Sequence, residues 1–149
     1  MGYYWYWLRI AHILAAVVAV GPLALVPWLA GQVVRGGGDS RAMLRTLQIT
    51  EYFYTRAGWL LILSGAALFY LTDWHQALHA WFLLCVGLFL ADNVVENRVR
   101  EPAIANLANL AKHDPTWRAT ALRLQRGTLV QTVTAGLILL LMLLRPSMV

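Results

Sequence analysis

The sequence is poor in charge and in cysteine. Charged residues make up 13% of the 149 residues, about half of their share in a soluble domain, whereas 60% of the residues are hydrophobic. A soluble fold of this length could not bury so much apolar surface, so much of it is expected to face lipid. The single cysteine, Cys85, excludes an internal disulfide. The net charge of +5 does not indicate nucleic acid, because basic residues in a membrane protein mostly set its topology.

Four apolar runs predict four transmembrane helices, since a span takes about 20 apolar residues. Residues 10–34 and 127–144 form the longest runs. Residues 57–72 and 76–91 form shorter runs, which helix-compatible neighbours extend. The first run is longer than the apolar core of a signal peptide, so we expect it to be retained. The expected helices cover about 7–34, 41–72, 75–98 and 116–145 of a single transmembrane domain, residues 1–149.

The connections between these runs are short, and they predict one bundle without linkers or internal repeats. Gly21-Pro22 is expected to bend the first helix. Pro102 and Pro115 bracket residues 103–113, whose leucines predict a short helix lying at the membrane interface. The predicted fold class is therefore all-α. It is an up-down-up-down four-helix transmembrane bundle with a short interfacial helix between the third and fourth helices.

The basic residues predict the orientation of this bundle. Ten of the 12 lysines and arginines fall in the first and third loops, and the other two fall in the tails. The second loop, around residues 72–75, has none. Because basic loops remain in the cytoplasm, both termini are expected outside. Tryptophans near the ends of the runs fit the aromatic belts of a membrane protein.

Three histidines are expected near the outer face. His75 and His79 are four residues apart and share a face if the third helix begins near residue 74, and His12 would lie at a similar depth to His79. Neutral imidazole is the commonest metal ligand and also binds haem iron. Arg9, one turn from His12, would be placed to pair with a haem propionate. Histidines at an interface are also often solvated belt residues, so both interpretations remain open here.

Acidic residues at the inner end of the third predicted helix form a second candidate cluster. Asp92 and Glu96 are four residues apart and share a helix face, and a carboxylate at this depth needs a partner. The antiparallel order brings four residues of other helices to the same level: Arg56, Arg126, Glu51 and Gln131. One interpretation is a structural ion-pair cluster of Asp92, Glu96, Arg56 and Arg126 that holds three helix ends together. The other is a proton entry path or a polar substrate site.

The first predicted helix has a recognisable pattern, Trp7-Leu8-Arg9-Ile10-Ala11-His12-Ile13-Leu14-Ala15, followed by Gly21 and Leu23. It resembles the opening of the HemJ-type protoporphyrinogen oxidases and of the copper-resistance D membrane domain. It also resembles a family of small, uncharacterised bacterial four-helix integral membrane proteins of this layout, which Arg56-Ala57-Gly58-Trp59, Ser64-Gly65 and Trp74 fit as well.

The resemblance implies a bacterial inner (cytoplasmic) membrane protein. HemJ-type proteins bind b-type haem, and a first-helix histidine that matches His12 is implicated in this. They also carry an essential lysine early in the third helix, where this sequence has His79-Ala80-Trp81-Phe82. The resemblance therefore implies haem binding more than the oxidase activity.

Two function hypotheses follow. The first is a protein that binds b-type haem or a metal near the outer face in a HemJ-like manner, through His12 and His79; if it is an enzyme, it is a haem-linked membrane oxidoreductase. The second is a non-catalytic accessory subunit of a larger membrane complex of respiratory type, or a homo-oligomer. The sequence contains no recognisable catalytic motif, which favours the second hypothesis, and a histidine inside an apolar run favours the first.

Overall fold

The computed structural model describes residues 2–36, 39–71, 79–111 and 113–144. Within these ranges the elements are all helices, and no strand forms. Three segments are long and apolar enough to cross a membrane: Tyr3–Val34, Ala80–Asn109 and Pro115–Leu143. The prediction of an all-α protein is confirmed, and three of its segments could span a membrane.

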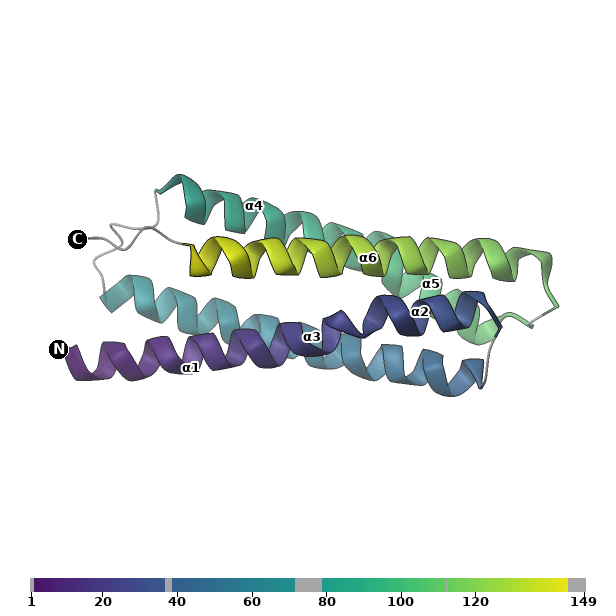
Figure 1. The fold of residues 1–149 in the computed structure, drawn as a ribbon, viewed down its shortest axis with the longest axis horizontal. Helices are drawn as coiled ribbons and strands as arrows, with labels where there is room; N and C mark the ends of the chain where they lie inside the picture. Colours follow the sequence, from purple (N-terminus) through teal and green to yellow (C-terminus); the bar gives the residue numbers. More distant parts are fainter. Residues whose placement is uncertain (1, 37–38, 72–78, 112, 145–149) are drawn as a thin grey trace.

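The helices form long arms that run alongside one another (Figure 1): α1 with η1 and α2, then α3, then α4 with η2 and α5, and finally α6. Their bounds are α1 Gly2–Val20, the 3-10 turn η1 Gly21–Ala24, α2 Val26–Val34, α3 Ser40–Leu71, α4 Ala80–Val95, the π turn η2 Glu96–Arg100, α5 Glu101–Asn109 and α6 Pro115–Leu143. α1 packs on α3, α4 packs on α6, and α2 lies against both α3 and α6. The helix expected at 41–72 corresponds to α3, which is not one of the three candidate spans.

The expected break in the first helix is present, and prolines account for it. α-Helical hydrogen bonding gives way to the 3-10 turn η1, which has Pro22 in its first turn. Pro27 has no backbone N–H, so the carbonyl of Leu23, four residues earlier, lacks its usual helical donor. The hydroxyl of Thr132 on α6 lies 2.9 Å from that carbonyl oxygen and 2.9 Å from the Thr128 carbonyl oxygen of its own helix, so the two carbonyls share its single proton. A side chain of a neighbouring helix thus satisfies a backbone group freed by a proline, as a membrane interior requires.

A short helix forms where one was expected within residues 103–113, but it is not separate from the preceding helix. The segment Glu101–Asn109 forms α5, which continues α4 through the π turn η2. Pro102 lies in the first turn of α5, where a missing N–H is tolerated. Ala103, Ile104 and Leu107 are buried against the other helices. This segment is therefore part of the packed core of the molecule.

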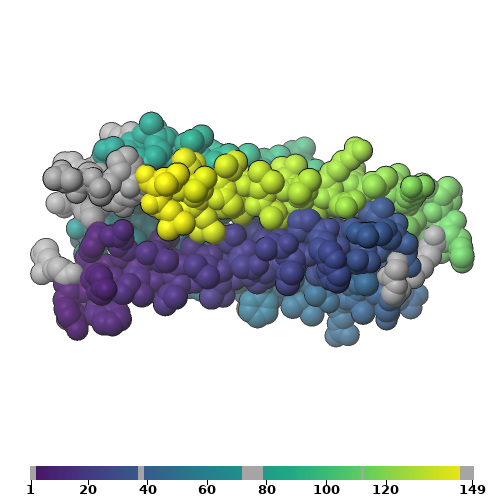
Figure 2. All heavy atoms as spheres, viewed as in Figure 1, coloured from purple at the N-terminus to yellow at the C-terminus, as the bar shows by residue number. Residues whose placement is uncertain are grey.

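The core is distributed unevenly along the long axis. We call residues 21–54 and 92–132 the packed half, and residues 3–20, 55–71, 80–91 and 133–144 the terminal half. The packed half contains all of the buried apolar cluster except Ala135; its members include Leu23, Leu47, Ile104 and Leu124. In Figure 2, the atoms of α6 lie directly against those of α2 along this half.

The terminal half exposes most of its large apolar side chains. Ile13, Leu14 and Val18 of α1 are exposed, as are Leu60 and Leu63 of α3. The buried side chains of this half, among the residues described, are all small: Ala16, Ala19, Cys85 and Ala135. A contiguous apolar surface of this kind is suited to lipid rather than to water.

Candidate functional site

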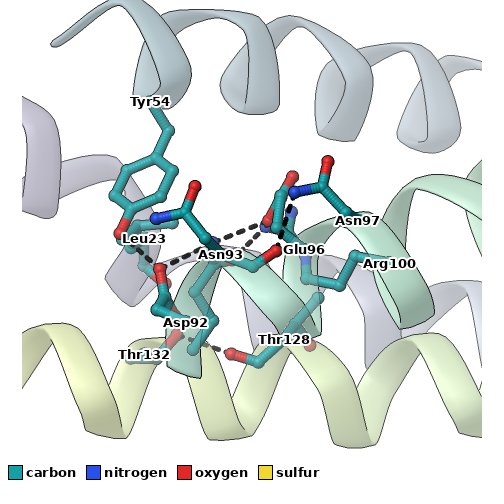
Figure 3. Close-up of polar contacts among 10 residues, drawn as sticks. Leu23, Tyr54, Asp92, Asn93, Glu96, Asn97, Arg100, Thr128 and Thr132 are labelled. Carbon is teal, nitrogen blue, oxygen red and sulfur yellow. Dashed lines mark hydrogen bonds and ion pairs between the residues drawn. The ribbon is translucent and has the colours of Figure 1, made fainter. Parts of the chain in front are cut away.

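A network of polar side chains lies inside the packed half (Figure 3). Asp92 lies in the last turn of α4, and Glu96 and Arg100 follow at intervals of four residues through the π turn. Tyr54 reaches the network from α3, and Gln131 reaches it from α6. Asp92 is 2% exposed and Arg100 and Gln131 are 0% exposed, so the centre of the network is buried, while Glu96 is partly exposed.

Hydrogen bonds join the three helical arms through this network. The hydroxyl of Tyr54 donates to Asp92 Oδ2 at 2.6 Å. Gln131 Nε2 donates to Glu96 Oε2 at 2.7 Å. Arg100 Nη1 donates to the same Glu96 oxygen, as an ion pair, and to Gln131 Oε1. Gln131 therefore uses both ends of its amide, which fixes the position of the arginine.

The π turn and a glycine of α6 make room for Arg100. A π turn inserts an extra residue into the helical ladder and is often found at functional sites. Gly127 of α6 faces this turn: a Cβ there would lie 3.0 Å from Val99 Cγ1 and 3.1 Å from Arg100 Cγ. The absence of a side chain at Gly127 lets α6 approach the turn, and the buried arginine lies along the gap.

The structure corrects the expected basic partners of this cluster. Arg56 and Arg126 are both exposed, and the Arg56 guanidinium lies over the ring of Tyr52 with its Cζ 3.9 Å from the centroid. Arg100 is the basic partner of the buried carboxylates instead. Its spacing of four residues from Glu96 could have indicated this pair, but the sequence interpretation counted Arg100 among the loop residues that set the topology. Tyr54 was missed because its chemistry alone does not distinguish it from belt aromatics.

His12 of α1 forms the second polar contact between helices, in the terminal half. Its ring Nδ1 lies 2.7 Å from Ser64 Oγ on α3. A Cβ at Gly65 would lie 3.5 Å from His12 Cε1, an ordinary contact distance, so the ring packs closely on α3 at this glycine. This is the hydrogen bond to a neighbouring helix that a polar group at this depth requires.

The Ser64 hydroxyl links His12 to the backbone of α3. Its Oγ lies 2.7 Å from the carbonyl oxygen of Leu60, 3.2 Å from that of Leu61 and 2.7 Å from His12 Nδ1. A hydroxyl proton directed at Leu60 requires Nδ1 to carry the ring proton, whereas a hydroxyl proton directed at His12 requires the ring proton on Nε2. The first of these tautomers is the one in which histidine binds a metal through Nε2, with its other nitrogen held by a hydrogen bond.

The other residues expected with His12 are less closely placed. Arg9 is exposed, and its Cζ lies 5.3 Å from the ring centroid of Trp5. His79 directly precedes α4 and is exposed. His75 lies outside the described residues. Within the part of the chain that the structure describes, no three His, Cys, Asp or Glu side chains are grouped to hold a metal ion.

Comparisons with protein-family models, with curated proteins and with solved structures found no significant match. The description of this chain as a helical protein suited to a membrane therefore rests on its own apolar helices and on the polar contacts between them.

Proposed function

We propose that this protein binds b-type haem or a metal ion through His12, as a small integral membrane protein of the bacterial inner membrane. The arrangement that we infer is an up-down-up-down four-helix bundle in which α3 also crosses the bilayer. The observation that carries the proposal is the His12–Ser64 hydrogen bond, because it occupies Nδ1 and leaves Nε2 as the nitrogen that would act as a ligand.

His12 would supply one ligand of such a group. The neighbouring Gly65 and Ala16 are small residues, which limits the side-chain bulk around the ring. Arg9 is one turn away and would pair with a propionate in place of Trp5. His79 would supply a second ligand from α4. A bound haem would supply one-electron redox chemistry, while the protein would set its position and exclude water.

An optical spectrum of the protein purified from native membranes tests this proposal. We expect a Soret band of b-type haem, or a stoichiometric metal by elemental analysis. His12→Ala should lose the band or the metal. Ser64→Ala should shift the band or weaken binding about 10-fold or more, because it removes the group that orients the ligand.

His113→Ala is the matched control, because His113 is exposed beyond the end of α5 and should have no effect on the spectrum. Colourless wild-type protein without bound metal would overturn the proposal. Binding that survives in His12→Ala would also overturn the role of His12.

The orientation has its own test. We infer that both termini face outside, because the first and third loops contain ten of the basic residues. In a Cys85→Ser background, Tyr4→Cys should react with a membrane-impermeant thiol reagent in intact cells. Asp39→Cys, in the first loop, should react only after the cells are permeabilised. The reverse pattern would show that the bundle is inserted the other way.

A non-catalytic role remains as the second candidate, and the apolar surface of the terminal half favours it. Exposed Leu14, Val18, Leu60 and Leu63 would fit a helix of a partner subunit or a second copy as well as lipid. In that case the protein would be an accessory subunit of a larger membrane complex. Cross-linking in native membranes through these positions should then give a defined product, while the purified protein is colourless.

A further inference from the structure

The helical arms are longer than the interior of a membrane is thick. α3 has 32 residues and α6 has 29, so at a rise of about 1.5 Å per residue they measure about 48 Å and about 44 Å. The hydrocarbon core of a bilayer is about 30 Å thick. To fit α3 within it would take a tilt of about 50°, whereas transmembrane helices tilt by about 0–40°. Part of each long helix is therefore expected to lie outside the hydrocarbon.

Contacts between the arms show which residues of α3 and α6 lie at the same depth. Tyr54 of α3 and Gln131 of α6 both reach Asp92, at 2.6 Å and 3.5 Å. Ile49 precedes Tyr54 by five residues, and Arg126 precedes Gln131 by five residues. Because α3 and α6 run in the same direction (Figure 1), Ile49 and Arg126 lie near one level.

The other two arms meet α6 close to Arg126. A Cβ at Gly31 of α2 would lie 3.2 Å from Gln125 Nε2, and a Cβ at Gly127 would lie 3.1 Å from Arg100 Cγ at the end of the π turn. One level therefore crosses all four arms, and we call it the boundary level. It passes through Gly31, Ile49, Arg100 and Arg126. We call the part beyond it the loop end: residues 31–36, 39–48, 101–111 and 113–125.

The exposed side chains change character at the boundary level. Toward the termini, α3 exposes Ile49 and Phe53, and α6 exposes Leu129 and Val133. On the loop end, the exposed residues of α3 and α5 are arginine, alanine, threonine, glutamine, glutamate, proline and asparagine. Among the described residues of the loop end, the one exposed large apolar side chain is Leu122, at 36%. The surface is thus apolar on one side of this level and polar on the other.

The interior of the loop end is built in the opposite sense. Large apolar side chains from all four arms are buried against one another there: Val33, Leu44, Leu47, Ile104, Leu107, Trp117 and Leu124. Helices solvated by water bury their large apolar residues and expose their polar ones. In lipid, nothing drives large apolar side chains inward. The loop end therefore has the construction of a helix bundle in water.

Exposed arginines gather around the boundary level. Within four residues of its members lie Arg45, Arg98, Arg123 and Arg126. Arg56 lies farther toward the termini, but its guanidinium covers the ring of Tyr52, one turn nearer the boundary level, as expected of an arginine that extends its charge out of lipid. Among the described residues the recorded ion pair joins Arg100 and Glu96, so these exposed arginines have no carboxylate partner.

We propose that the loop end projects from the bilayer as a water-exposed helical domain, and that the arginines around the boundary level bind the phosphates of anionic phospholipids. Guanidinium groups pair bidentately with phosphate oxygens. Lipid phosphates lie at the edge of the hydrocarbon, where the exposed side chains change from apolar to polar. The inference rests on the membrane insertion contained in the proposed function, but it depends neither on the orientation of the bundle nor on a ligand at His12.

Spin-label accessibility in liposomes tests where the bilayer ends. In a Cys85→Ser background, labels at Ala105→Cys and Ala119→Cys should be relaxed by a water-soluble paramagnetic agent, because both positions are exposed on the loop end. Labels at Leu63→Cys and Leu137→Cys, which are exposed toward the termini, are the matched controls. They should be relaxed by dissolved oxygen instead, because oxygen concentrates in lipid.

The two proposals fail in different ways in this experiment. If the labels on the loop end respond to oxygen as strongly as the controls, the loop end lies in the bilayer, and the present inference is wrong while membrane insertion stands. A response to the water-soluble agent at all four positions would contradict membrane insertion itself and would overturn both proposals.

Spin-labelled lipids test the role of the arginines. In phosphatidylcholine vesicles, wild-type protein should retain labelled phosphatidylglycerol more strongly than labelled phosphatidylcholine. Arg126→Gln should lower this preference about 2–5-fold, the scale of one arginine near an anionic surface. Arg118→Gln is the control, because Arg118 is exposed on the same helix about 12 Å beyond the boundary level. No preference in the wild type, or an equal loss in both variants, would overturn the lipid site.

Discussion

The packed half and the terminal half of this protein are built from the same helical arms but are held together differently. In the packed half, leucines such as Leu47 and Leu124 are fully buried, and a network of charged and polar side chains connects three arms. In the terminal half, the largest buried side chain among the described residues is Cys85, and the prominent polar contact is His12 with Ser64.

The difference shows what each half can support. Helices gain little from apolar contact with each other when lipid tails are the alternative, so small residues and hydrogen bonds hold them together. The packed half has many such interactions and forms a fixed framework. The terminal half has few, and there α1 and α3 meet at an imidazole and a hydroxyl. The proposed ligand site and the packed core are thereby separated along the length of the molecule.

Removal of the Arg100 side chain should lower the free energy of unfolding more than any other change described below. Arg100→Leu leaves Glu96 and Asp92 buried without their positive partner, which typically costs about 3–5 kcal/mol. We expect the free energy of unfolding in detergent to fall by an amount in that range. Thermal denaturation followed by tryptophan fluorescence measures the change.

The matched control is Arg56→Leu, because Arg56 is exposed and lies on the Tyr52 ring. Its effect should stay below about 1 kcal/mol, as for exposed charges. Equal destabilisation by the two variants would mean that Arg100 is not the partner of the buried carboxylates.

A pair of leucine truncations compares the halves directly. Leu124 is 0% exposed within the core of the packed half, and Leu14 is 59% exposed on α1. Leu124→Ala removes buried contacts and leaves a cavity, which costs about 2–5 kcal/mol. Leu14→Ala should change stability by no more than about 0.5 kcal/mol. Comparable losses in purified protein would show that the terminal half is as tightly packed as the other half.

A smaller effect on stability is expected from removal of the Thr132 hydroxyl, which contacts the Leu23 carbonyl at the break between α1 and α2. Thr132→Val preserves the shape of the side chain but removes the hydroxyl that reaches the Leu23 carbonyl, which costs about 0.5–1.5 kcal/mol, the net contribution of a typical hydrogen bond. Thr120→Val is the control, because the Thr120 hydroxyl donates to Thr116 of its own helix in an exposed position. Unfolding temperatures of the two variants in the same detergent check the difference, and no difference would contradict the role of Thr132.

The sequence predicted the helical membrane class because long apolar runs leave few alternatives. Asp92 and Glu96 were found from their spacing, and Gly21-Pro22 was found from its chemistry. The choice of Arg100 over Arg56 and Arg126 was not predictable in this way. It depends on a π turn and on the close approach of Gly127, which arise from packing between helices.

The partner of His12 illustrates the same limit. A polar partner on a neighbouring helix was required by depth alone. Which residue supplies it depends on how α1 and α3 are aligned along their lengths, and periodicity within one helix contains no information about that alignment. Ser64 was recognisable only as part of a small Ser-Gly pair.

The bond from Thr132 to the Leu23 carbonyl has a mechanical consequence. Thr132 directly follows Gln131, which lies in the carboxyl network, so one short stretch of α6 holds both the network and the break between α1 and α2. A rotation of α6 that moves the Gln131 amide must also pull on the Leu23 carbonyl, at the base of the arm that carries His12. The Thr132 hydroxyl therefore connects the movement of α6 at the carboxyl network to the position of α1.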